Sequence, residues 1–229
     1  MKPTTIRWLA VIACVGTLAP GAVSAQTPWF GGTPPPATAA PTAPPPDWDG
    51  LRAILYFDVG GGGTQKFEFD PSSGGSNGSV DNDPTVGLGL RIEHTLSDYL
   101  ALGAQAELLS YKLEGADRNI GGHFDGWIKS RYLHRINANV AQETYLGMPV
   151  GFSIIRFDSN PTLTRETSSL GWNIGLLAGT QFLVRGRLGT MLEMGWRRIE
   201  LHNEVAASGA NLTTKQNQFV LNIGYLMHF

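Results

Sequence analysis

Apolar side chains recur at every second position in a series of short runs between residues 51 and 229. The clearest run covers residues 219–229. One face of this run would carry Phe219, Leu221, Ile223, Tyr225, Met227 and Phe229. The opposite face would carry Val220, Asn222, Gly224, Leu226 and His228. A period of two indicates a β-strand whose faces meet different surroundings, so the pattern predicts a strand over these last residues.

The runs together predict eight strands joined by turn-rich loops. We place seven of them at residues 51–66, 85–96, 99–113, 126–138, 144–157, 171–183 and 188–202, and the eighth after a loop at 203–213. Four long loops alternate with three short turns, among them Ser97-Asp98 and Arg185-Gly186. This alternation is typical of an all-β, antiparallel up-and-down transmembrane β-barrel. The fourth run has the least regular pattern, so its register stays open.

The composition of the polar face indicates which face of the strands points outward. A soluble barrel of the lipocalin kind would show the same period with its apolar face inside. Here the polar face is rich in Gly and carries Asp58, Arg91, Glu93, Glu107, Lys129, Arg131, Arg135, Glu193 and Arg197. Inside a narrow barrel, Gly leaves room for long side chains, and charges of both signs can pair. The pattern therefore predicts an enclosed charge network and an apolar face toward lipid.

Aromatic residues near the ends of the predicted strands fit the same orientation. They are Tyr99, Phe157, Trp172, Phe182, Tyr225 and Phe229. Membrane barrels carry aromatic girdles where the apolar band meets the two interfaces. These positions are therefore expected to lie at the membrane boundaries.

The first 25 residues predict an export signal. Lys2 and Arg7 precede an apolar run at 8–18, and a small-residue cleavage site follows at 23–25. Residues 11–14 resemble a lipoprotein box, so signal peptidase I cleavage and lipoprotein processing at Cys14 both stay open. Residues 26–50 hold eight of the 14 prolines and predict a disordered periplasmic linker. Recognition of this segment by a proline-binding partner is the alternative. Residues 51–229 would form the barrel.

Charge and motif content exclude several classes of function. Removal of residues 1–25 leaves 15 basic and 19 acidic residues, or 15 − 19 = −4, which gives no electrostatic basis for binding nucleic acid. No later segment approaches the ~20 apolar residues of a membrane helix, so a spanning structure has to be a closed barrel. The glycines at 60–63 lack the Lys-Ser or Lys-Thr pair of a phosphate loop and fit a bend or bulge. Asp81, Asn82 and Asp83 lack the spacing of a calcium loop. We expect no cofactor and no metal.

Three segments combine Gly with apolar alternation, at residues 145–152, 171–175 and 222–225. They resemble the small eight-stranded outer-membrane β-barrels, the family of the OmpA membrane domain, OmpX and Ail. The last strand also resembles the C-terminal assembly signal of such barrels, at Asn222, Gly224, Tyr225, Met227 and Phe229. The resemblance implies a monomer in the outer membrane of a Gram-negative bacterium with both termini in the periplasm. It also implies contact with outer-membrane lipid and lipopolysaccharide, and recognition of the last strand by the barrel assembly machinery.

This resemblance identifies architecture better than role, and two noncatalytic roles stay open. In an adhesin-like role, the loops at 70–84 and 203–213 would contact an extracellular ligand, whose identity the sequence does not indicate. In a channel, a narrow ion path would be controlled by Arg91, Glu93, Arg131, Arg135, Glu193 and Arg197. The interior of an eight-stranded barrel is just wide enough for side chains to fill. We therefore expect a structural or surface-interaction role.

A lipid A-modifying enzyme is the third alternative, because some outer-membrane barrels catalyse such reactions with a lipid-facing His and Ser. His94 and His134 both fall on the predicted lipid face. No Ser lies within two positions of either histidine, and a one-residue shift in the fourth strand would turn His134 inward. We therefore expect no enzymatic activity.

Overall fold

The computed structural model describes residues 49–61, 63–69, 77–81, 84–112, 118–156, 168–185, 187–204 and 211–229. The expected signal segment, Cys14 and all but the last two residues of the expected linker lie outside these ranges. Within them, every regular element is a strand: β1 (Leu51–Gly61), β2 (Thr64–Phe69), β3 (Gly78–Asp81), β4 (Thr85–Ser97), β5 (Leu100–Lys112), β6 (Arg118–Arg135), β7 (Val140–Arg156), β8 (Ser168–Val184), β9 (Leu188–Glu204) and β10 (Asn211–His228).

Eight of the described strands close into a barrel. The neighbour order is β1-β4-β5-β6-β7-β8-β9-β10, and β10 pairs back onto β1, with every pairing antiparallel. Closure leaves no edge along this ring, so each strand of the ring has a hydrogen-bonded neighbour on both sides. The prediction of an eight-stranded antiparallel up-and-down barrel is confirmed.

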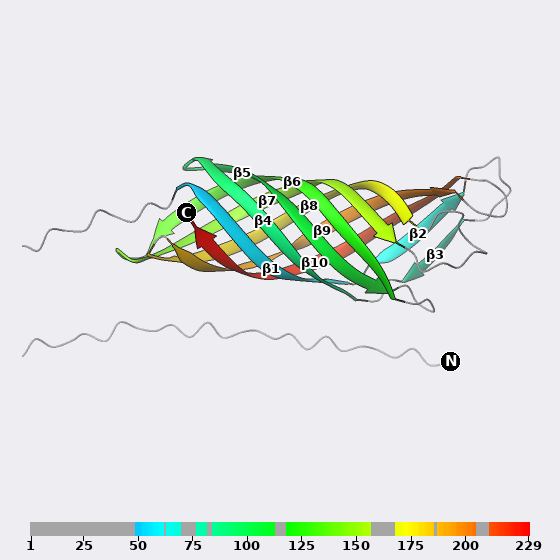
Figure 1. Cartoon of the computed structure of the whole chain (residues 1–229), viewed down its shortest axis with the longest axis horizontal. Coiled ribbons are helices and arrows are strands. Elements are labelled where there is room, and N and C mark those ends of the chain that lie inside the picture. The colour runs from blue at the N-terminus through cyan, green and yellow to red at the C-terminus, as the bar shows by residue number, and fades with distance from the viewer. Residues whose placement is uncertain are drawn as a thin grey trace, which may run out of the picture. The chain divides into compact units, whose positions relative to one another are not determined.

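The two remaining strands extend the wall at one end. β2 continues along β10 beyond β1, and β3 pairs with β2. In Figure 1 this hairpin lies at the opposite end of the barrel from the C-terminus, at what we call the loop end. The other end, which holds the connections β4–β5, β6–β7 and β8–β9, is the turn end.

A β-bulge separates β1 from β2. Gly61 pairs with Phe219 and Gln65 pairs with Gln216, so the first strand advances four residues while β10 advances three. At Gly63 a Cβ would collide with the carbonyl oxygen of Asn217. The absence of a side chain lets the two backbones approach, which is a common reason for Gly at a bulge.

The register fixes the stagger of the barrel. Paired residues can be followed around the ring from Tyr56 of β1, one residue per strand, until they reach Phe67 of β2. Phe67 lies 67 − 56 = 11 residues after Tyr56 in the chain. One of these residues belongs to the bulge, so the stagger is about ten residues. For eight strands, a stagger of about ten residues corresponds to a tilt of about 40° and a backbone radius of about 8 Å. Such a cylinder is filled by its own side chains.

The polar residues are enclosed and the apolar ones point outward. Leu88 is 58% exposed and Ile223 is 57% exposed, whereas Arg91 and Glu193 are 0% and 1% exposed. A smaller set of apolar side chains packs inside with the charged ones, including Ile54, Tyr56, Trp127, Tyr145, Leu177 and Met191. This distribution is the reverse of a soluble barrel and matches an exterior that faces hydrocarbon.

The aromatic positions expected in girdles fall at both ends. Tyr99, Phe182, Tyr225 and Phe229 are exposed near the turn end, and Trp172 is exposed near the loop end. Phe157 lies outside the described residues. No helix among the described residues is long and apolar enough to cross a bilayer.

The main error in the predicted elements concerns the fourth barrel strand. Residues 118–125 were expected in a loop, but β6 begins at Arg118 and contains Gly121 and Gly122. Gly121 pairs with Leu109 on one side and Ile155 on the other. Two ladder partners hold these glycines in the strand, so the surrounding sheet overrides their weak strand propensity. The first predicted strand is likewise two strands, and β3 lies in the expected loop at 70–84.

Candidate functional site

The centre of the barrel holds a two-pronged ion pair between β4 and β9. Arg91 donates from its two terminal nitrogens to the two carboxylate oxygens of Glu193, at 3.0 and 2.9 Å. The guanidinium also lies 3.6 Å from the centroid of the Trp127 ring and 5.2 Å from that of Tyr56. A planar guanidinium suits both contacts, because it matches a carboxylate edge-on and stacks on aromatic faces.

The remaining polar atoms of this pair also have partners. The Tyr145 hydroxyl and the Asn222 amide each donate to Glu193 at 2.8 Å, and Arg91 Nε donates to Gln105 at 2.9 Å. Buried charges are tolerated when further hydrogen bonds satisfy them in this way. Asn222, which the sequence placed in the assembly signal, thus also belongs to the enclosed network.

A second group of contacts lies on the loop side of the central pair. Glu107 binds Arg197, which donates from its second terminal nitrogen at 3.0 Å, and accepts a 2.6 Å hydrogen bond from the Tyr56 hydroxyl. Asp125 accepts from Gln105 at 2.9 Å and from Asn173 at 2.8 Å. Gln105 therefore links the central pair to this group, since it contacts Arg91 as well.

A third group closes the turn end. Lys129 lies between two carboxylates, 2.5 Å from Glu93 and 2.6 Å from Glu143. Arg52 shares the same acceptors, at 2.8 Å from Glu143 and 3.5 Å from Glu93. Arg131 lies 3.0 Å from Glu143. Three cations and two carboxylates thus fill this end of the interior.

The rim of the turn end is tied to the chain just before β1. Arg131 donates to Asp49 at 2.9 Å and to the Thr95 hydroxyl at 2.8 Å. His228 Nε2 lies 2.9 Å from the carbonyl oxygen of Asp49. Asp49, half exposed, therefore lies at the turn-end mouth of the barrel.

Most residues expected in the charge network lie on the inner face. Those that are buried there are Asp58, Arg91, Glu93, Glu107, Lys129, Arg131, Glu193 and Arg197. Asp58 differs from the others because neither of its carboxylate oxygens has a hydrogen-bond partner among the described residues. The assignment of Arg135 to the network is wrong: the residue shares the inward register of Arg131 but is exposed. It is the last residue of β6, so its side chain lies beyond the enclosed volume.

Sequence reasoning missed several members of the network. They are Arg52, Gln105, His123, Asp125 and Glu143. His123 and Asp125 fell in the region taken for a loop, and Glu143 lay one residue before the predicted start of its strand. Arg52 had the inward register of the first predicted strand, so its alternation with Leu51 and Ala53 was the signal that could have identified it.

A histidine and a serine do meet inside the barrel, at positions other than those considered from sequence. His123 Nδ1 lies 2.7 Å from Ser153 Oγ, and Asn173 donates to the same oxygen at 3.0 Å. A nucleophile needs an orienting acid for its base and room for a substrate. His123 Nε2 has no partner within the described residues, and a nearby cavity lined by Thr85, His123 and others holds about 10 Å³. His134 is exposed on the outer face.

That small cavity is lined by both polar and apolar residues and lies in the loop half of the interior. Around it, Thr85 Oγ1, His123 Nε2 and Gln218 Nε2 are buried without a hydrogen-bond partner in the described structure. A volume of about 10 Å³ is close to the ~10–15 Å³ needed for one water molecule. The described part of the chain contains no group of His, Cys, Asp or Glu able to hold a metal ion. The site is thus an ionic core, packed by side chains.

Comparison with known proteins gives matches at the level of structure. No protein-family model matches this chain, and no curated protein matches it in sequence. The outer membrane protein OprG from Pseudomonas aeruginosa superimposes with a TM-score of 0.55 at 13% identity, over 79% of this chain and 97% of OprG. Neisserial surface protein A gives a TM-score of 0.38 at 13% identity, over 77% and 97% of the two chains. Ail, the attachment invasion locus protein of Yersinia pestis, gives 0.36 at 14% identity, over 78% and 99%. The chain has the fold of the small eight-stranded outer-membrane β-barrels.

Proposed function

We propose that this protein is a closed outer-membrane barrel of a Gram-negative bacterium that presents a surface for interaction outside the cell. The observation that carries the proposal is the inverted distribution of side chains, with Leu88 and Ile223 exposed and Arg91 and Glu193 enclosed. An exposed apolar band is stable only against hydrocarbon, and a closed barrel is the β-structure that can span a bilayer.

The interaction surface would be the part of the wall that projects beyond this band. β10 has 18 residues, which at a tilt of about 40° span about 45 Å along the barrel axis, against ~30 Å of hydrocarbon. Its outward residues are apolar from Met227 to Phe219 and polar from Asn217 to Asn211. The loop-end third of β10 would therefore stand in water outside the cell.

On the neighbouring strands, the outward residues also change from apolar to charged at the height where those of β10 become polar. On β9, the exposed Trp196 is followed by Arg198 and Glu200, which lie 3.4 Å apart. On β2, Glu68 forms an ion pair with Lys215 of β10. Outward ion pairs belong in water and not in lipid. Together with β3, these strands would form a rigid sheet above the membrane on which a partner could dock.

The packed interior supports binding over transport as the main role. The central ion pair, its aromatic neighbours and the turn-end cations fill a cylinder of about 8 Å radius. Asp49 accepts a hydrogen bond from Arg131 at the turn-end mouth. A docking role needs only the outer sheet and the loops, which leaves the core to provide stability.

Cysteine accessibility tests both membrane location and topology. Gly78 of β3 has open space around its Cβ position, and Asn139 is exposed in a connection at the turn end. In a chain with Cys14 replaced by Ala, a membrane-impermeant maleimide should label Gly78→Cys on intact cells. It should label Asn139→Cys only after the outer membrane is permeabilised. The reverse labelling pattern would exclude periplasmic termini, and labelling of neither variant together with soluble fractionation would exclude the membrane location.

A narrow ion channel is the second candidate, favoured by the unpartnered polar atoms of the loop half. Asp58 and Gln218 lie there with unsatisfied side-chain atoms, and Lys129 has two carboxylates between which it can exchange. Planar-bilayer recording of the refolded barrel separates the candidates. Absence of conductance in both the wild type and Glu193→Ala would contradict a channel function. Discrete conductance steps in the wild type would favour the channel over a closed docking barrel.

A further inference from the structure

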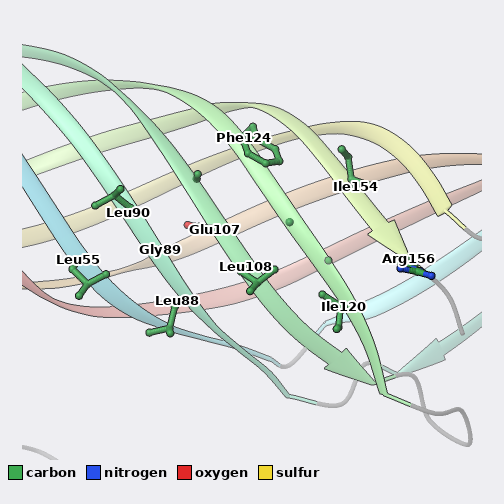
Figure 2. A pocket seen from close by; sticks show the side chains of 13 residues that line it. Leu55, Leu88, Gly89, Leu90, Glu107, Leu108, Ile120, Phe124, Ile154 and Arg156 are labelled. Carbon is green, nitrogen blue, oxygen red and sulfur yellow. The ribbon is translucent and has the colours of Figure 1, made fainter.

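A groove of about 530 Å³ crosses the outside of the wall formed by β4, β5 and β6 (Figure 2). Its floor is Ala106 and Gly122 with the adjoining backbone. Its sides are apolar, formed by Leu88, Leu90, Leu108, Ile120, Phe124 and Ile154. On a barrel exterior it is a concave site that opens directly to lipid.

The groove exists because two small residues interrupt rows of large ones. Ala106 pairs with Leu90 on β4 and with Phe124 on β6. Gly122 pairs with Leu108 on β5 and with Ile154 on β7. Large side chains on both sides of a small one leave a depression, since outward residues of paired positions stand next to each other. The two depressions are diagonal neighbours, so they join into one groove directed toward the loop end.

Among the described side chains, one cation lines the groove, at its loop end. Arg156, the last residue of β7, is exposed and pairs with Ile120 of β6. In Figure 2 it lies beyond Ile154, while Leu55 and Leu90 lie at the other end of the groove. The site is therefore apolar along its length and positively charged at the end near the expected membrane surface.

We propose that this groove binds an acyl chain of lipopolysaccharide, with a phosphate of the same molecule held by Arg156. The proposal rests on the proposed function, because only a loop end outside the cell places Arg156 beside the outer leaflet. An apolar trough matches a saturated chain in shape, and guanidinium binds phosphate through paired hydrogen bonds. A lipid with a chain but no phosphate next to it would use only half of the site.

Filling the groove with one side chain tests the proposal. Ala106→Leu places three extra carbons on the floor without changing the inner face. Ala178→Leu is the matched control, because Ala178 is also exposed on the outer face, between Leu146 of β7 and Met194 of β9. Full-length barrels would be refolded into phospholipid nanodiscs and titrated with rough lipopolysaccharide, and bound lipid would be counted by native mass spectrometry. We expect about tenfold weaker binding for Ala106→Leu, equivalent to two lost methylene contacts, and no change for Ala178→Leu.

The phosphate contact has its own test. Arg156→Gln should weaken binding of rough lipopolysaccharide several-fold and abolish the preference of the barrel for it over its dephosphorylated form. Equal binding of rough lipopolysaccharide by wild type and Ala106→Leu would contradict acyl-chain binding in the groove. Equal retention of phosphatidylethanolamine would show a nonspecific lipid surface, and dimers lost in Ala106→Leu would assign the groove to a second copy of the chain. Because the measurement uses nanodiscs, failure of the groove is distinct from failure of the topology, which cysteine labelling on cells reports.

Discussion

Several glycines of the inner face lie directly against aromatic rings, which occupy the space that a side chain would need. A Cβ on Gly89 would collide with the Tyr56 ring, and one on Gly147 would collide with the Trp127 ring. Both rings flank the guanidinium of Arg91. Each large side chain that surrounds the central ion pair thus lies against a glycine on a neighbouring strand. This pairing of small with large residues explains why a narrow barrel can enclose so many charges and still be packed.

Removing the central carboxylate should be costly. In Glu193→Ala the Arg91 guanidinium, the Tyr145 hydroxyl and the Asn222 amide all lose an acceptor. We expect the free energy of unfolding to fall by about 3–5 kcal/mol, the usual cost of leaving a buried charge unpaired. Urea unfolding in lipid vesicles measures this change. Arg135→Ala, at an exposed position, should stay within about 0.5 kcal/mol of the wild type, and a loss below about 1 kcal/mol in Glu193→Ala would contradict a tightly coupled core.

The unpartnered carboxyl group of Asp58 should behave in the opposite way. The described interior holds five buried basic and six buried acidic residues, and Asp58 is the acidic one without a hydrogen-bond partner. Asp58→Asn removes the excess charge at nearly constant shape, so we expect the free energy of unfolding to rise by about 1 kcal/mol. Asp125→Asn is the matched comparison and should destabilise by about 1–3 kcal/mol, since Gln105 and Asn173 both donate to its carboxylate. Destabilisation by both substitutions would mean that Asp58 has a stabilising partner.

At the scale of elements, the bulge between β1 and β2 should decide whether the loop-end hairpin stays attached. Gly63→Ala would drive a Cβ into the carbonyl of Asn217, whereas Gly78→Ala in β3 meets open space. We expect Gly63→Ala to release β2 and β3 from β10 while the barrel ring stays folded. Hydrogen exchange reports this directly, as loss of protection at the amides of residues 65–69 with residues 219–228 unchanged. Protection equal to that of Gly78→Ala would show that the bulge tolerates a side chain.

The last strand should also carry the information for assembly. Tyr225 and Met227 point outward from β10, Phe229 is 73% exposed, and the amide of Phe229 donates to the carbonyl of Leu51. These contacts add little packing, so deletion of Phe229 should leave refolding in vesicles nearly unchanged. In cells we expect a several-fold fall in the amount of heat-modifiable barrel in the outer membrane. An unchanged amount of heat-modifiable barrel would contradict the role of Phe229 in an assembly signal.

A strand could be predicted from the sequence where its two faces differ in polarity. β4, with Leu88 and Leu90 alternating with Gly89 and Arg91, was placed to within one residue, because alternation is a local property of the sequence. The beginning of β6 was missed because Gly121 and Gly122 have strand conformation only through their ladder partners on β5 and β7. The inward face was readable from alternation, but the partners of each charge were not. Arg91 meets Glu193 across 102 sequence positions, a distance that only the closed register defines.

At the scale of the whole molecule, three tryptophans report the inside-out arrangement of the barrel. Trp127 is 1% exposed and lies within the ionic core, while Trp196 and Trp172 are 44% and 39% exposed on the outer face. Trp172 of β8 lies nearer the loop end than Trp196, which is followed on β9 by the polar Arg198 and Glu200. If the apolar band faces hydrocarbon, the fluorescence of these residues should respond differently to quenchers placed in lipid chains.

Single-tryptophan barrels, with every other Trp replaced by Phe, test this in vesicles of brominated lipids. We expect strong quenching of Trp196, weaker quenching of Trp172, because Trp172 lies beside Arg198 at the polar end of the wall, and little quenching of Trp127, because bromine atoms quench only at contact and the barrel wall separates Trp127 from lipid. Unfolded protein in urea provides the control, since all three should then respond alike. Strong quenching of Trp127 with none of Trp196 would mean that the chain encloses its apolar face, and neither a membrane location nor an outer lipid groove would survive that result.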